Sequence, residues 1–233
     1  MEPSTLVLGV LWYGAFIVSI VLHEGAHALV AYKLGDPTAF RGGQVTLDPR
    51  PHIRREPVGT IIMPILSFIF TNHQFMIGWA HAPYDPHWAE RYPRRKALMA
   101  LAGPMANLLT VIVVGVLMRV GLATGYFVLP EIEEIGFASV VAGTEAVGSY
   151  GVATLLSILF GLNLILFVLN MLPLPPLDGS SVVTLFFSQK AARKIEEFRR
   201  DRMFSLLGII VAWRVAGSIF WPAFLWSLSI LYA

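Results

Sequence analysis

Four long apolar segments constrain the fold of this chain more than any other feature. Each is long enough to cross roughly 30 Å of hydrocarbon as a helix, and inside a bilayer the backbone must satisfy its own hydrogen bonds. Only 14% of the residues are charged, whereas soluble domains carry about 25%. The sequence therefore predicts an all-α membrane protein, a polytopic helical bundle surrounded by lipid. The four expected spans are about Thr5–Lys33, Ala97–Arg119, Gly151–Leu172 and Met203–Tyr232.

A fifth apolar stretch, Val58–Phe70, is too short to span and is followed by the polar residues Thr71–Gln74. The basic residues indicate its course. Fifteen of the 17 lysines and arginines fall in three groups, within positions 33–55, 91–96 and 190–202. These groups share one side of the membrane only if Val58–Phe70 does not cross. We therefore expect a re-entrant or buried segment, a cytoplasmic basic side in the cell membrane, and both termini outside.

The first span contains the sequence HEGAH, from His23 to His27, about 15 Å from its cytoplasmic end at Lys33. A carboxylate at bilayer depth costs roughly 2.5–3.5 kcal/mol, so Glu24 needs a strong reason to be there. On a helix, residues i and i+4 share one face, and two imidazoles so placed can hold one Zn²⁺. The intervening Glu24 then lies where a general base is needed. The alternative, a structural histidine pair with a snorkelling glutamate, suits an uncharged span poorly.

A catalytic zinc site with two histidines needs one more protein ligand, and the chain has no cysteine. The best candidate is Asp178, in the motif NMLPLPPLDGS (Asn170–Ser180). On the expected topology the third span runs inward, so it delivers this motif to the side where HEGAH lies. The prolines end a regular helix, and irregular backbone at membrane depth is tolerated where it is buried or lines a cavity. Alternatively, Asp178 is only a turn or N-cap carboxylate before Gly179.

Three motifs in this order resemble the site-2 protease family of intramembrane zinc metalloproteases: HEGAH, LAGPMAN and NMLPLPPLDG. The runs LGDPTAFRGGQVTLDP, GWAHAPYDP and PRRKALMALAGPMANLL are similar to its compact bacterial and archaeal branch, which has no PDZ domain. The resemblance implies a three-helix catalytic core with Glu24 as the base. The zinc ligands that it implies are His23, His27 and Asp178.

The resemblance also makes Asn107 and Asn170 candidates for polarising or orienting the scissile carbonyl. From residue chemistry alone, each asparagine is equally suited to an interhelical hydrogen bond. Two departures from the family pattern stand out. Ser180 occupies a position where the family often has a second glycine, and HIRREP (His52–Pro57) replaces an HIDP-like run, so the local loop differs.

The expected function is that of an intramembrane zinc endopeptidase that cleaves within the transmembrane segments of other proteins. We expect one membrane domain (1–233), with a catalytic core at about 5–188 and a C-terminal transmembrane segment at about 203–232. Nucleic acid is not an expected partner, because no basic block carries interleaved aromatic residues. The alternative function is a membrane metal-ion transporter, in which the His/His/Asp site holds ions in transit and Glu24 is only another ligand.

Two further stretches leave alternatives open. Arg41–Pro49 alternates enough to form a short strand that pairs with an unwound substrate, but its glycines and proline also allow a plain loop. His73, His81 and His87 lie with Asp85 in one stretch and could bind a second metal ion, although a solvated loop explains them more simply.

Overall fold

A computed structural model describes residues 4–199 and 201–233, which are mostly helical. Arg200, which belongs to the third basic group, lies outside the described residues. In chain order the elements are α1 (Thr5–Lys33), α2 (Thr38–Arg41), α3 (Pro49–Arg55), the π-helical turn η1 (Val58–Ile62), α4 (Met63–Phe70), α5 (Pro86–Arg91), α6 (Pro93–Ala123), β1 (Phe127–Val128), the 3₁₀ turn η2 (Ile132–Glu134), β2 (Ala142–Gly143), α7 (Ser149–Asn170), α8 (Gly179–Val182), the 3₁₀ turn η3 (Val183–Phe186), α9 (Gln189–Arg199) and α10 (Arg202–Tyr232).

The four expected spans are confirmed as α1, α6, α7 and α10, each long and apolar enough to cross a membrane. Their ends differ from the expected positions by no more than four residues. The largest difference is at α6, which begins at Pro93 and so includes the charged residues PRRK before the apolar run. Proline suits the first turn of a helix because its fixed φ is already helical and its missing N–H has no partner there.

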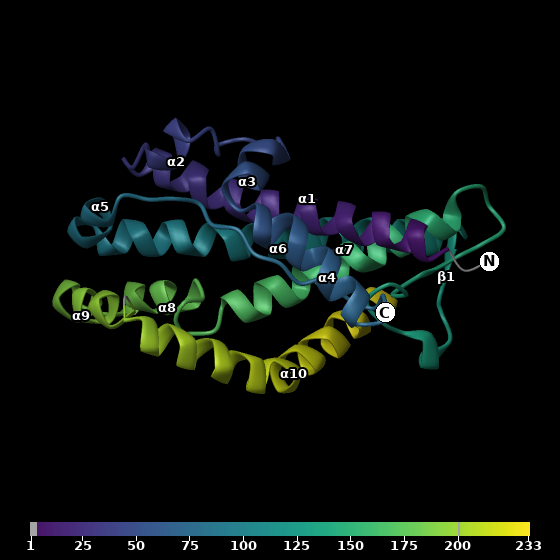
Figure 1. Cartoon of the computed structure of the whole chain (residues 1–233). Coiled ribbons are helices and arrows are strands. Elements are labelled where there is room, and N and C mark those ends of the chain that lie inside the picture. Colours follow the sequence, from purple (N-terminus) through teal and green to yellow (C-terminus); the bar gives the residue numbers. More distant parts are fainter. Residues whose placement is uncertain (1–3, 200) are drawn as a thin grey trace.

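Helices α1, α6 and α7 pack against one another at the centre of the bundle, while α10 lies along its outside (Figure 1). In the most apolar part of α7, 44% of the residues are buried within the protein, against 11% in α10. Helix α10 therefore leaves most of its apolar surface for lipid. It still reaches the loop after α7, because a Cβ added to Gly208 would lie 1.7 Å from the carbonyl oxygen of Pro175.

The described ends of the chain and strand β1 lie at one end of the bundle, and α2, α5, α8 and α9 lie at the other (Figure 1). The second end carries the basic residues at the start of α6 and those of α9. The arrangement is the one that the distribution of lysines and arginines predicts.

The short apolar stretch enters the bundle as η1 and α4 and then turns back. The backbone N–H of Ile77 donates to Ser67 Oγ (2.8 Å), and that of Trp79 donates to the carbonyl of Gly59 (3.0 Å). The returning chain thus runs antiparallel to the helix that precedes it. Gly78 permits this contact, since a Cβ there would lie 2.3 Å from the carbonyl oxygen of Gly59. The segment thus doubles back within the bundle, as a re-entrant or buried segment would.

Of the two alternatives at Arg41–Pro49, the plain loop holds and the short strand does not, since residues 42–48 form turns and bends between α2 and α3. Gly43 has a φ of +71°, which a regular strand does not accommodate, and Asp48 caps α3 by accepting from the N–H of Arg50 (3.0 Å). Strands occur instead in the loop after α6, where β1 and β2 pair antiparallel with Phe127 opposite Gly143. Strands of two residues are too short to show an alternating pattern in the sequence.

Candidate metal centre

Two histidines one turn apart on α1 place their imidazoles side by side. The Nε2 atoms of His23 and His27 lie 3.0 Å apart, and the two ring planes are nearly perpendicular, at 87°. Both residues are buried within the bundle. This is the arrangement that the i, i+4 spacing of HEGAH predicts.

The carboxylate of Asp178 completes a group of three donors. Its Oδ2 lies 3.2 Å from His23 Nε2 and 3.3 Å from His27 Nε2. Among the side chains that the structure describes, these are the three whose donor atoms are close enough to share an ion, all within 4.8 Å of one another.

The other ring nitrogen of each histidine is held by an acceptor on α6. His23 Nδ1 donates to Asn107 Oδ1 (2.6 Å), and His27 Nδ1 donates to the carbonyl of Met99 (2.7 Å). These bonds place the ring protons on Nδ1 and leave both Nε2 lone pairs directed toward Asp178. Metal-binding histidines are typically oriented in this way. The donor set of two neutral imidazoles and one carboxylate fits a catalytic zinc ion.

A chain of buried amides and hydroxyls extends from His23 through all three core helices. Asn107 Nδ2 donates to Asn163 Oδ1 (2.8 Å), and Asn163 Nδ2 donates to Ser19 Oγ (2.8 Å). Ser19, Asn107 and Asn163 are all fully buried. The sequence motifs indicated Asn107 but not Ser19 or Asn163, which appear in the sequence as isolated polar residues within apolar spans. An isolated polar residue at such depth is itself a signal, because it needs a partner.

Gly103 lets the histidines approach α6. A Cβ at this position would lie 2.4 Å from His27 Nε2 and 2.7 Å from His23 Cε1, so no other residue fits without displacing a ligand. Gly103 belongs to the motif LAGPMAN, in which only Asn107 was expected to have a role. Its signal in the sequence is a glycine that interrupts a helix.

Glu24 is buried next to the histidine pair and contacts the segment that returns from α4. Its Oε2 accepts a hydrogen bond from the backbone N–H of Ala82 (2.5 Å), within the run GWAHAPYDP. A single backbone donor thus fixes the orientation of this carboxylate. The loop at Arg41–Pro49 also approaches here, since a Cβ on Gly25 would lie 3.3 Å from the carbonyl oxygen of Thr46.

The remaining candidates are not among the three clustered donors. Asn170 is half-buried at the end of α7, and its side chain has no hydrogen-bond partner among the residues that the structure describes. His81 pairs through Nδ1 with Glu56 Oε1 (2.9 Å) and is 70% exposed, as expected for a solvated loop. His52 is buried, with its Nε2 3.3 Å from the carbonyl oxygen of Thr46.

Comparison with known proteins gives a consistent result. The model for Peptidase family M50 matches residues 12–214, a range that includes all three donors. A Bacillus subtilis protein provisionally named zinc metalloprotease YwhC is 35% identical over 168 residues, which are 72% of this chain and 64% of the relative. The Mycobacterium tuberculosis H37Rv protein provisionally named zinc metalloprotease Rip2 is 26% identical over 205 residues, 88% of this chain and 68% of the relative.

The protein of the same name from Mycolicibacterium smegmatis is 28% identical over 170 residues, 73% of this chain and 54% of the relative. The chain thus spans between about half and two thirds of the length of these relatives. No solved structure matches the chain significantly.

Proposed function

This chain belongs to peptidase family M50, the site-2 protease family, and from that premise we propose that it is an intramembrane zinc endopeptidase. The observation that carries the proposal is the convergence of His23, His27 and Asp178 inside a bundle of helices long enough to span a membrane. The metal-transporter alternative gains no support from the relatives, which are named for zinc proteolysis.

Zinc held by these three donors would supply a Lewis acid that polarises a peptide carbonyl and acidifies water. The role of the protein is to hold the donors and to move protons. Glu24 accepts the proton of the attacking water and delivers it to the amide nitrogen as the C–N bond breaks. The hydrogen bond from Ala82 leaves Glu24 with one committed oxygen, so the other is the proton acceptor.

The two asparagines are assigned different tasks in this proposal. Asn107 is a positioning residue, because its oxygen accepts from His23 and its nitrogen donates to Asn163. Both ends of that amide are therefore committed. Asn170 is the candidate for orienting the scissile carbonyl, since its side chain is half-buried and keeps its donors available among the described residues.

The proposed orientation puts the basic end of the bundle, and with it the metal centre, in the cytoplasmic half of the cell membrane with the termini outside. The chain lacks cysteine, so single introduced cysteines report accessibility without background. A cysteine replacing Arg95 or Ala191 should label from the cytoplasm, and one replacing Glu133 from outside. Labelling of positions 95 and 191 from opposite sides would contradict this orientation.

The proposed substrate is a transmembrane helix that unwinds locally at the site. A helix hides its carbonyls in i→i−4 hydrogen bonds, so cleavage needs a segment that opens at low cost. Glycine and proline cost about 1 and 3 kcal/mol relative to alanine in a helix. The expected substrates are therefore single-span proteins with such residues in the cytoplasmic half of the span. Edge pairing with the Arg41–Pro49 segment is not part of this proposal, because that segment is a loop.

Glu24→Gln tests the chemistry. The amide keeps the shape of the side chain but cannot take a proton from water, and loss of a general base typically costs about 10²–10⁴ in rate. Zinc stoichiometry should stay that of the wild type, because Glu24 is not one of the three donors. Cleavage of a single-span substrate in proteoliposomes and metal content are the two measurements.

Glu56→Gln is the matched control, since it is the same substitution in a glutamate that pairs only with the exposed His81. It should cleave at the wild-type rate. The assignment fails if Glu24→Gln cleaves as fast as wild type. It also fails if the wild type moves zinc across vesicles and cuts no membrane peptide, an outcome that favours a transporter.

A further inference from the structure

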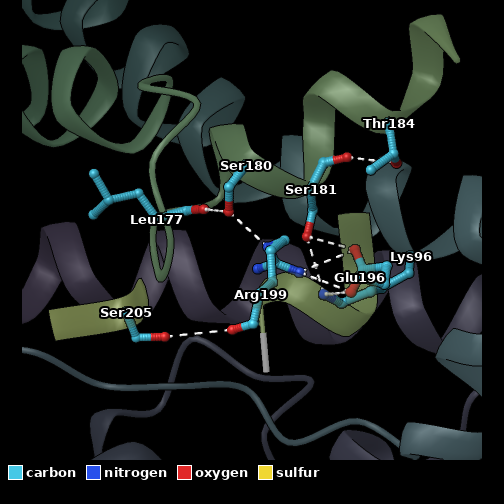
Figure 2. A network of polar contacts seen from close by, with 8 residues as sticks. All are labelled: Lys96, Leu177, Ser180, Ser181, Thr184, Glu196, Arg199 and Ser205. Carbon is cyan, nitrogen blue, oxygen red and sulfur yellow. Dashed lines mark hydrogen bonds and ion pairs between the residues drawn. The ribbon is translucent and has the colours of Figure 1, made fainter. Parts of the chain in front are cut away.

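A buried network of charged side chains lies next to the turn that bears Asp178, and the proposed chemistry does not use it (Figure 2). Glu196 Oε2 lies 3.0 Å from Lys96 Nζ and 2.9 Å from Arg199 Nη1. Burial alone would raise the pKa of Glu196, but Lys96 and Arg199 outweigh it and lower that pKa below its usual value. Burying charges is costly even when they are paired, so the network calls for a reason.

Two serines connect the network to Asp178. Ser180 Oγ accepts from Arg199 Nε (2.6 Å) and donates to the carbonyl of Leu177 (2.6 Å). Ser181 Oγ accepts from Lys96 Nζ (3.0 Å) and donates to Glu196 Oε1 (3.3 Å). Each hydroxyl thus donates one hydrogen bond and accepts another, and both serines are buried. Figure 2 shows the side chains of Lys96, Glu196 and Arg199 facing Ser180 and Ser181.

The turn needs such support because it is short and irregular. Asp178 precedes α8, which has four residues, and follows a loop with three prolines. On its other side the turn is already pressed against the end of α7, since a Cβ on Gly179 would lie 2.4 Å from the carbonyl oxygens of Met171 and Leu172. The turn is therefore held between the end of α7 and the charged network on α9.

Helix α6 contacts both histidine donors directly and reaches the third donor through residues near it. Asn107 holds His23 and the Met99 carbonyl holds His27. Lys96, one turn before Met99, holds Ser181 and Glu196. The histidines are braced directly, whereas Asp178 is braced through its neighbours in the chain. One helix thereby fixes the relative positions of donors that are 151 to 155 residues apart in sequence.

We propose that Ser180, held by Arg199, which in turn pairs with Glu196 of α9, is a positioning residue that sets the Asp178 carboxylate at the two histidines. The inference rests on the proposed function, because it assigns a task within the same metal site. It also gives a reason for serine at a position where the family often has glycine: a glycine has no hydroxyl to accept from Arg199.

Ser180→Ala tests the proposal through zinc affinity rather than activity alone. The zinc dissociation constant of purified protein is measured by competition with a chelator, and thermal unfolding of the metal-free protein is measured in parallel. Loss of a residue that orients a ligand typically weakens metal binding about 10–100-fold. We expect that loss in Ser180→Ala, with a smaller effect on the unfolding of the metal-free form.

Ser205→Ala is the matched control, because Ser205 Oγ donates to the backbone carbonyl of the same Arg199 (3.3 Å) but does not contact the Asp178 turn. It should bind zinc like the wild type. Arg199→Lys keeps the positive charge but loses the planar guanidinium with its paired N–H donors. It should lower zinc affinity as Ser180→Ala does. Both changes act through one hydrogen bond. The double variant should therefore bind zinc no more weakly than whichever single variant has the lower zinc affinity.

The outcomes separate this inference from the proposed function. Failure of the wild type to bind zinc removes the proposed function. Tight binding in both the wild type and Ser180→Ala overturns only the positioning role, as does a fall in the stability of the metal-free protein at unchanged zinc affinity. If Ser180→Ala does not fold, Arg199→Lys decides, and wild-type zinc affinity in that variant overturns the inference.

Discussion

The histidine half and the aspartate half of the metal centre arrive at one point from very different backbones. His23 and His27 lie on a regular helix of 29 residues, whose period alone puts their rings on one face. Asp178 lies on a turn after three prolines, and no local period fixes its direction. The contrast shows two ways of placing a ligand: by secondary structure, and by contacts with distant parts of the chain.

The two halves also differ in their access to solvent. The side chains of His23 and His27 are 8% and 7% exposed, whereas that of Asp178 is 22% exposed. The group of donors is therefore most exposed on the side of the aspartate. A hydrolytic site inside a membrane needs an opening, since water is a reactant, and the histidine side is packed against α6.

Replacing a ligand in either half should have the largest effect. A structural zinc site with about four ligands contributes about 10–16 kcal/mol, so each ligand is worth roughly 2.5–4 kcal/mol. His23→Ala and Asp178→Ala should both lower the affinity for zinc on the order of 10²–10³-fold. The comparison predicts a difference in the metal-free protein. His23→Ala leaves the buried Asn107 oxygen without its donor, at a cost of about 1–3 kcal/mol, whereas water can replace contacts of the more exposed Asp178.

Thermal unfolding of the two metal-free variants measures this difference directly. His23→Ala should unfold at the lower temperature. If the metal-free Asp178→Ala variant unfolds at the lower temperature instead, the aspartate turn contributes more to the stability of the centre than the helix does. The contrast between the two halves would then be reversed.

The histidine half is also the half that the sequence predicts well. Hydropathy predicts the four spans because lipid requires a long apolar helix, and the HEGAH spacing predicts the geometry of the pair. Asp178 was found through its motif, because no local rule links it to α1. The returning course of Val58–Phe70 followed from the positions of lysines and arginines, which report on the whole topology.

What escaped prediction depends on contacts between distant residues. Ser19 and Asn163 are 144 positions apart, and Lys96 and Glu196 are 100 apart. Nothing in a local pattern pairs them. The choice between strand and loop at Arg41–Pro49 stayed open for a similar reason, since alternation marks a strand only where a neighbouring strand is available to pair with it.

Gly103→Ala gives the smaller and sharper test of the histidine half, because it moves the ligands without removing one. The added methyl group would lie 2.4 Å from His27 Nε2, so the imidazole or the helix must shift. We expect zinc affinity to fall about 10–100-fold, as for other changes that misplace a ligand. Gly115→Ala, on the same helix, is the control, since its Cβ would meet only Phe160 Cε2 at an ordinary 3.6 Å.

The control should leave zinc affinity unchanged and, by removing a helix glycine, raise stability by up to about 1 kcal/mol. Chelator competition and thermal unfolding of the two variants are the measurements. Equal zinc affinity in Gly103→Ala and Gly115→Ala would show that the histidines have room to move along α6. In that case the close packing of α1 against α6 is not what fixes the pair, and helix period alone would suffice.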